Sequence, residues 1–266
     1  MIREKLIEKR IGETTSFRWR SSEVSRIEGL SDAVFGFAIT LLVVSLEVPK
    51  TFNELAIAMS GFGAFAISFA LLFLVWYNQH KFFRRYGLQD LVTIVLNAIL
   101  LFVVLFYVYP LKFLFTFLVS RFTGGHGEIR LPNGNIESML ENDGQMGSLM
   151  LIFGVGYLAI FMIFVLLHIH AYRRREQLQL NRLEVFDTIS SIQESGLNCV
   201  IALLSIALVW FGGARLAGVS GMAYMLTGIV MALHGFFMGA RRRRMEKEFA
   251  SQFSEPVYQP APELQS

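Results

Sequence analysis

The chain has 266 residues, a formal net charge of +3 and a hydrophobic fraction of 54%, with 25 phenylalanines among its apolar side chains. Its mean hydropathy is +0.50, and several apolar runs approach the roughly 20 residues that carry a helix across a membrane. These values exclude an ordinary soluble domain and indicate an integral membrane protein. The small positive charge marks segments that meet anionic lipid headgroups, so it gives little support to nucleic acid binding.

Residues 1–24 form a charged N-terminal segment that contains no apolar run. Without such a run, the segment does not have the form of a cleavable signal peptide. Ser25 and Glu28 form an S-x-x-E pattern, the capping box that precedes many helices, so the first helix is predicted to begin close to Ser25. We therefore expect a cytoplasmic segment over 1–24 and a transmembrane domain over 25–245.

The first membrane helix carries Arg26, Ser31 and Asp32 near its start. Ionised side chains are costly in lipid and usually face protein or water. After Asp32 the apolar run covers only residues 33–44, which is twelve residues or roughly 18 Å of helix. That length is short for a helix surrounded by lipid, so the sequence favours a helix that lines a path.

Helical spacing places one stripe of side chains along this helix. Its members are Ala33, Phe37, Thr40, Leu41, Val44 and Val48. If the stripe faces a symmetry axis, it forms hydrophobic rings with a ring of Thr40 hydroxyls between them, a constriction that can gate by dewetting. The alternative is ordinary helix packing in which Thr40 donates to the carbonyl of Gly36, and periodicity alone favours this alternative.

The polar groups at the start of the helix need partners. Arg26 and Asp32 are six residues apart, which points them to different sides of a helix, and each is expected to reach another helix. The candidate partners at the same cytoplasmic level are Trp76 and His80 in the second membrane helix, and Asn97 in the third could satisfy a group deeper in. We expect a structural polar network here, and direct binding of an ion is the alternative.

Five further apolar runs, over residues 55–78, 91–109, 149–168, 196–213 and 216–240, bring the expected number of membrane helices to six. The third membrane helix, which contains the run 91–109, is expected to end at Pro110. The Gly-rich segment 119–147 indicates an external loop, and the linker 176–191 is polar enough to form a cytoplasmic helix. The last two helices should be joined by a tight turn near Gly213, and residues 246–266 are expected to form a disordered cytoplasmic tail.

Lysine and arginine are distributed unevenly along this plan. On the side of the N-terminus there are 19, against 5 on the other side. By the positive-inside rule both termini are expected in the cytoplasm, with the protein in the cell membrane. The expected fold is an all-α integral membrane protein of six transmembrane helices.

The motif Arg-x-x-x-Leu-Ser-Asp at residues 26–32, followed by the run 33–48, resembles the Arg-x-x-x-Phe-Ser-Asp signature of the bacterial transmembrane protein 175 family. Trp76, His80, Asn97 and Pro110 are similar to further features of that family. The resemblance covers the first 110 residues by motif and the rest only by the six-helix plan.

The resemblance implies a potassium-permeable leak channel, a homotetramer with its pore on the oligomer axis and lined by the first helix. It implies potassium ions, membrane lipids and other copies of the chain as partners, with no cofactor and no metal beyond potassium in transit. A constriction residue five positions after the Asp and a selectivity Thr eight positions after it correspond to Phe37 and Thr40, with Leu41 and Val44 continuing the pore face. Phe37 departs from the family pattern of Ile or Leu, so the constriction is expected to differ in width or shape.

Gly154 to Tyr157 superficially resembles a potassium filter, but it lacks the leading Thr and final Gly and lies inside a continuous apolar run. Small residues in a membrane helix favour close helix packing instead. The five histidines have no metal-ligand spacing, and no common enzyme motif is present, so an enzyme is not expected.

Two other classes remain as alternatives to a channel. One is a proton-coupled secondary transporter in which Asp32 and His80 would titrate, although such proteins usually show paired broken helices in two repeats. The other is a membrane scaffold that conducts no ion.

Overall fold

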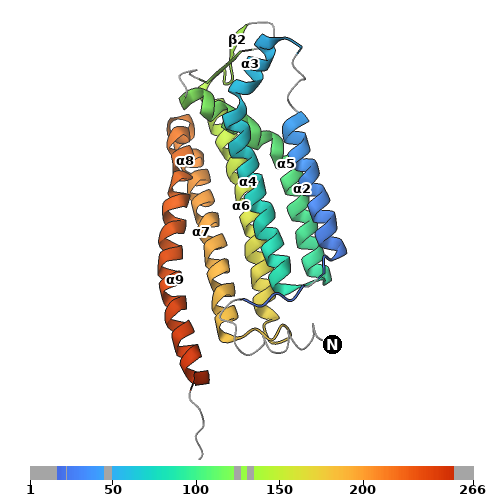
Figure 1. Ribbon diagram of the computed structural model, residues 1–266. Coiled ribbons are helices and arrows are strands. Elements are labelled where there is room, and N and C mark those ends of the chain that lie inside the picture. The colour runs from blue at the N-terminus through green and yellow to red at the C-terminus, as the bar shows by residue number, and fades with distance from the viewer. Residues whose placement is uncertain (1–16, 22, 45–49, 123–126, 131–134, 255–266) are drawn as a thin grey trace, which may run out of the picture.

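The computed structural model describes residues 17–21, 23–44, 50–122, 127–130 and 135–254. Long helices run side by side, and a short two-stranded sheet lies beyond one end of them (Figure 1). The elements in chain order are α2 (Arg26–Val44), α3 (Phe52–Ser60), α4 (Phe62–Tyr86), α5 (Leu91–Phe122), β1 (Glu128–Arg130), β2 (Ile136–Ser138), α6 (Asp143–Arg173), α7 (Arg182–Gly212), the 3-10 helix η1 (Gly213–Leu216), α8 (Ala217–Ala223) and α9 (Met225–Ser254).

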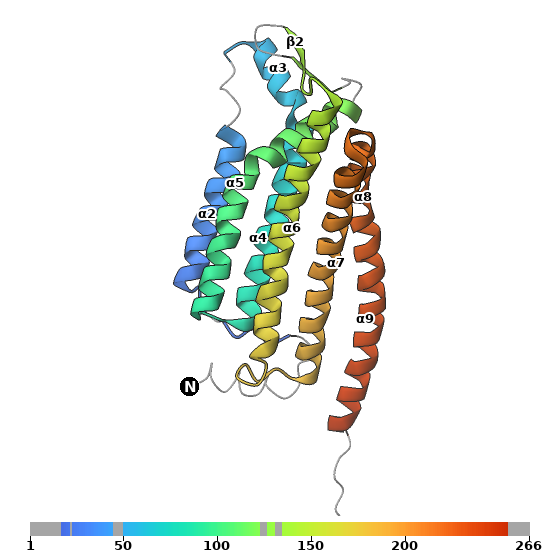
Figure 2. The same ribbon diagram turned by 180° about the vertical axis from the view of Figure 1, so that it is seen from behind.

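Five helical stretches in the described part of the chain are long and apolar enough to cross a membrane. They are Phe62–Tyr86, Leu91–Arg121, Gly144–Arg173, Arg182–Gly212 and Ala217–Glu248. The shorter α2 packs against α4 and α5 at one edge of the bundle, and α9 lies at the opposite edge, as both views show (Figure 2). The expectation of a helical membrane protein is therefore confirmed.

The start of α2 follows from local hydrogen bonding. The Ser25 backbone N–H donates to the Glu28 carboxylate, and the Glu28 N–H donates to the Ser25 hydroxyl, each at 3.3 Å. This is the reciprocal pattern of a capping box. The helix begins at Arg26, as the sequence predicts.

The prediction that the third membrane helix ends at Pro110 is wrong. Pro110 lies inside α5, which continues to Phe122. Proline costs a helix one backbone hydrogen bond and introduces a steric clash, but packing on the buried side chains of Tyr107, Val108, Leu111 and Leu114 holds the helix together on both sides of it.

The prediction of a loop over 119–147 is therefore too long at both ends. At its far end α6 begins at Asp143, where the Asn142 side chain accepts from the Gln145 N–H, a favourable N-cap. Between the two helices β1 and β2 pair antiparallel, with Glu128 opposite Ser138 and Arg130 opposite Ile136. The separate helix expected over 176–191 is also corrected: α7 begins at Arg182, capped by Asn181 and Glu184, and continues unbroken into the apolar run.

The predicted run 55–78 is divided into α3 and α4 at Gly61. At the other end of the chain α9 continues to Ser254, so the first part of the predicted tail is helical. Residues 255–266 and 1–16 lie outside the described residues.

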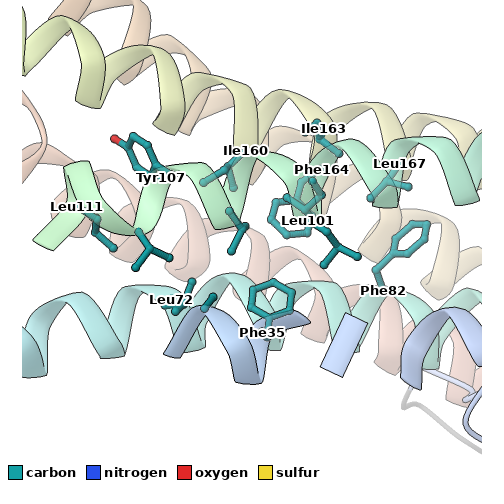
Figure 3. Packing of buried hydrophobic residues seen from close by; sticks show 14 of the residues in the cluster. Phe35, Leu72, Phe82, Leu101, Tyr107, Leu111, Ile160, Ile163, Phe164 and Leu167 are labelled. Atoms are coloured by element: carbon teal, nitrogen blue, oxygen red, sulfur yellow. The ribbon is translucent and has the colours of Figure 1, made fainter. Parts of the chain in front are cut away.

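The core lies where α2, α4, α5 and α6 meet (Figure 3). Side chains from all four helices interdigitate there: Phe35, Leu72, Phe82, Leu101, Tyr107, Leu111, Ile160, Ile163, Phe164 and Leu167. In contrast, only 6% of the apolar stretch within Ala217–Glu248 is buried. One face of α2 is therefore packed into the core, whereas most of the surface of α9 is exposed.

A short strap, residues 17–21, crosses one end of the bundle. Arg18 and Arg20 each bring a guanidinium Nη2 to the Glu184 carboxylate, at 3.0 and 2.7 Å, and Glu184 is 1% exposed. The hydrogen bond to Glu184 raises the pKa of Arg18 above its ordinary value, although burial opposes this. The Arg20 N–H also donates to the Arg84 carbonyl at 3.1 Å, so the strap ties α4 to α7.

Candidate pore helix and its polar network

The helix α2 has one face toward its own bundle and one face outward. The buried face consists of side chains that are at most 2% exposed: Ser31, Phe35, Ala38 and Leu42. On the outward face Phe37 is 68% exposed, and Ala33 and Thr40 are exposed as well. The predicted stripe thus lies outside the core of its own chain over these three positions.

The other stripe positions differ. Leu41 is half-buried and packs against the core, so it lies at the border of the outward face. Val44 is the last residue of α2, but its side chain lies outside the described residues, as does all of Val48. The Thr40 hydroxyl donates to the Gly36 carbonyl at 2.8 Å, which is the intrahelical bond expected for a threonine in a membrane helix.

A buried chain of hydrogen bonds joins α2 to α4 and α5. The Gln79 Nε2 donates to Asn97 Oδ1 at 3.0 Å, the Asn97 Nδ2 donates to Ser31 Oγ at 2.9 Å, and Ser31 Oγ donates to the Ile27 carbonyl at 2.8 Å. Ser31, Gln79 and Asn97 are at most 2% exposed. Because buried polar groups are costly without partners, this chain specifies how α2 sits against its neighbours.

Gln79 was missed by sequence reasoning, which considered only its neighbours in the second membrane helix. Its signal was available: Gln79 lies beside His80 and one helical turn after Trp76, at the level already assigned to the network. An amide can donate and accept at once, so it suits a buried position between two helices.

A second contact lies at the surface beside this chain. The Trp76 Nε1 donates to Asp32 Oδ1 at 2.8 Å, and the Trp76 ring stacks on the His80 ring with centroids 5.4 Å apart. The structure thus brings together Ser31 with Asn97 and Asp32 with Trp76 and His80. Arg26 is exposed and makes no hydrogen bond or ion pair within the described residues, so it stands apart from the other predicted members.

The described residues contain no cluster of three metal-ligating side chains. Over its described residues, the outward face of α2 is apolar apart from the Thr40 hydroxyl. The helix is held by the buried amide network behind this face and by the Asp32 to Trp76 hydrogen bond at the surface. The hydroxyl on this surface, that of Thr40, is already bonded to the Gly36 carbonyl.

The sequence is similar to those of known potassium channels. Residues 26–107 match the family model described as endosomal/lysosomal potassium channel TMEM175. A potassium channel of Marivirga tractuosa is 41% identical over 244 residues, which cover 91% of this chain and 98% of that protein. A potassium channel of Chamaesiphon minutus is 34% identical over 106 residues, 37% of this chain and 52% of that protein.

Solved structures show the same relationship. The crystal structure of a threonine-to-alanine variant of the potassium channel MtTMEM175, in complex with a nanobody fusion protein, superposes with a TM-score of 0.74 at 40% identity, covering 86% of this chain and all of that chain. A TMEM175 homologue from Chamaesiphon minutus, at 24% identity and a TM-score of 0.51 over 84% of this chain and 99% of that one, shares the fold. The chain belongs to the TMEM175 family, to which the motif at the start of α2 had pointed.

Proposed function

We propose that the protein is a potassium-permeable leak channel whose pore is formed by α2 helices from several copies of the chain. The observation that carries the proposal is the outward face of α2, where Phe37 is 68% exposed although the opposite face of the same helix is buried. The relatives described above are named potassium channels, and membership of their family excludes an enzyme.

A single α2 cannot enclose a conduit, and the motif occurs once in the chain. We therefore infer a closed homo-oligomer, because symmetric copies can surround an axis, and the family resemblance favours a tetramer. In each subunit α2 would be the sixth membrane helix beside the five stretches already long enough to span.

The orientation proposed is with both termini in the cytoplasm of a cell whose plasma membrane holds the channel. Support comes from the arginines that gather at one end of the bundle, where α4 ends, α7 begins and α9 ends (Figure 1). They include Arg84, Arg85, Arg173, Arg174, Arg175 and Arg182. Cytoplasmic loops are enriched in such residues.

Within the pore, Phe37 is proposed as the hydrophobic constriction and Thr40 as the hydroxyl ring one helical turn further on. Leu41 would border the pore face, because it already packs partly on its own core, and Val44 would continue that face. The buried network of Ser31 and Asn97 would hold the helix at a fixed rotation, since a rotation would break its hydrogen bonds.

The experiment is potassium flux into liposomes that contain the purified protein, without a substrate or a pH gradient. Phe37→Leu should raise the flux because it removes ring volume at the constriction, and Thr40→Ala should lower the ratio of potassium to sodium flux. Phe236→Leu is the matched control: it makes the same change at a side chain that is 67% exposed on α9.

Two results would sink the proposal. One is equal flux in Phe37→Leu, Phe236→Leu and the unaltered protein. The other is flux that requires a proton gradient and shifts its pH dependence in Asp32→Asn, which would favour a carrier. If the protein passes no ion at a known density in the vesicles, the scaffold class gains.

A further inference from the structure

A polar cavity of about 440 Å³ lies at the arginine-rich end of the bundle, away from α2. Its walls are the ends of α4, α7 and α9, closed on one side by the strap residue Phe17. A second, smaller cavity of about 30 Å³ is lined by His168 and shares Lys81, Ser191 and Glu194 with the first. The volume falls within the range of sites that hold small molecules.

The charges that line this cavity are of both signs, and some are already paired. Arg242 Nε lies 2.8 Å from Asp187 Oδ1, and Arg242 also bonds Glu246. In contrast, the side chains of Lys81, Arg85 and Glu194 make no ion pair or hydrogen bond with any other residue in the described ranges. Arg85 rests its guanidinium on the Phe17 ring at 4.7 Å, which leaves its donors available.

The surroundings of the cavity match the level of phospholipid headgroups. On α9, a turn or more before Arg242, the side chains of Phe236 and Phe237 are 67% and 66% exposed. The run Arg241–Arg244 begins four residues after Phe237. An exposed apolar surface that changes within two turns to a basic one is typical of the boundary between acyl chains and headgroups.

The mixture of charges argues against a simple anion as the occupant. A bare phosphate could pair with Lys81 and Arg85, but the Glu194 carboxylate lines the same space and would face it with like charge. A group that carries a phosphodiester and a primary ammonium satisfies both signs. Each contact would be a charge-assisted hydrogen bond, the stronger kind.

We propose that this cavity binds the headgroup of a zwitterionic aminophospholipid of the phosphatidylethanolamine type. Lys81 and Arg85 bind the phosphodiester, and Glu194 accepts from the ammonium. The acyl chains lie along the exposed apolar surface of α9. The site is separate from the pore face, so it stands or falls independently of ion conduction.

The test is retention of added lipid by the purified full-length protein in detergent, measured by native mass spectrometry. The lipids are phosphatidylethanolamine, phosphatidylcholine and phosphatidylglycerol with identical acyl chains. Phosphatidylethanolamine should be retained at least about tenfold better than phosphatidylcholine, the effect of one charge-assisted hydrogen bond, because a trimethylated amine cannot donate to Glu194.

Three variants and a control sharpen the test. Glu194→Gln should reduce the preference for phosphatidylethanolamine over phosphatidylcholine, because the amide oxygen still accepts from the ammonium but without charge assistance. Lys81→Gln and Arg85→Gln should each weaken retention of both lipids, since both carry the phosphodiester. Arg243→Gln removes an exposed charge from the same end of α9 and should change nothing. Thermal unfolding of each variant identifies any that fails to fold, and the others then decide.

Four outcomes would overturn the proposal. They are equal retention of the two lipids by the unaltered protein, an unchanged preference in Glu194→Gln, unchanged retention in both Lys81→Gln and Arg85→Gln, and displacement of the lipid by inorganic phosphate. The last would indicate a site for a soluble anion.

Discussion

Asn97 is the central link between α2 and the rest of the bundle, because its side chain donates to Ser31 and accepts from Gln79. Its own exposed fraction is 2%. Neither partner can reach water easily. If the amide were removed, Gln79 Nε2 would lose its acceptor, and Ser31 Oγ would keep only its bond to the Ile27 carbonyl.

Asn97→Ala should therefore lower the free energy of unfolding by about 1–3 kcal/mol, the cost of a buried unsatisfied group. The matched control is Asn78→Ala, which removes a half-buried amide that, among the described residues, bonds the Leu74 carbonyl of its own helix and no other group. Denaturant unfolding in detergent measures both. Equal losses in the two variants would contradict a special role for the Asn97 link.

Asp90 lies in the turn between α4 and α5 and receives several contacts. Thr93 Oγ1 donates to it at 2.8 Å, and its other carboxylate oxygen lies 2.9 Å from His170 Nε2 and 3.5 Å from Arg174 Nη2. Burial alone would raise the pKa of Asp90, but the Thr93 hydrogen bond and the positive charges of His170 and Arg174 outweigh it and lower the pKa.

A carboxyl group whose pKa is lower in the folded protein stabilises the fold above its unfolded pKa of about 3.9, and this contribution is lost as the pH falls through the folded value. Asp90→Asn should therefore destabilise the protein at neutral pH and make little difference in strong acid. Thermal unfolding of both proteins across this pH range checks the sign. A constant difference at all pH values would rule out the charge as the cause.

At the scale of elements, the packing of α5 on α6 depends on a close approach at Gly156. A methyl group at this position would overlap the Tyr107 ring, whose hydroxyl donates to the Phe153 carbonyl. Small residues allow membrane helices to approach this closely, which is the role that the sequence predicted for Gly154 and Gly156.

Gly156→Ala should destabilise the protein by about 1–3 kcal/mol, the usual cost of overpacking a core. Gly235→Ala is the control, because nothing lies within 4 Å of its added methyl and alanine favours a helix by about 1 kcal/mol. Unfolding measurements should move the two variants in opposite directions. A neutral Gly156→Ala would mean that Tyr107 can shift at little cost.

Local signals predicted some elements well and others poorly, for identifiable reasons. Ser25 and Glu28 predicted the start of α2 because a capping box is satisfied within four residues. Pro110 misled because its penalty is local, whereas the packing that outweighs it comes from α6, far away in sequence. The pairing of β1 with β2 was also missed, since two three-residue strands carry no periodicity to detect.

The site shows the same division. Membership of a polar network could be predicted for these side chains because each is polar in an apolar helix, and such groups need partners. Which of them pair, as Asp32 does with Trp76 and Ser31 with Asn97, could not be read from spacing. Arg26 could not be excluded from the network by spacing alone, because spacing does not show that its side chain is exposed and turned away from the other members. The rotation of α2 about its own axis exposes Phe37 and leaves Leu41 half-buried. This rotation is set by the packing of α2 against the side chains of several helices, which no local pattern in the sequence shows.

At the scale of the whole molecule, the strap over residues 17–21 joins both sides of the bundle through one buried carboxylate. Two guanidinium groups converge on Glu184, and α2 begins at Arg26, five residues after the strap in sequence. We therefore expect the loss of these ion pairs to make the start of α2 less firmly held.

Glu184→Ala should release the strap, since two positive charges would be left together without their partner. Trypsin should then cleave after Arg18 and Arg20 several times faster than in the unaltered protein. Glu176→Ala is the control, because the Glu176 side chain is 91% exposed and lies 3.9 Å from Arg175, a surface pair of small energetic value. Equal cleavage rates in the two variants would mean that other contacts hold the strap.

The hydrogen bond from Thr40 to Gly36 has a further consequence if α2 surrounds a conduit. The single proton of this hydroxyl is already engaged by the backbone, so only oxygen lone pairs remain for a passing species. A cation that sheds water there meets an acceptor, whereas chloride meets no donor. Rejection of anions would then arise from one bond inside a helix, at a ring one turn beyond the constriction proposed at Phe37, without any acidic side chain in that ring.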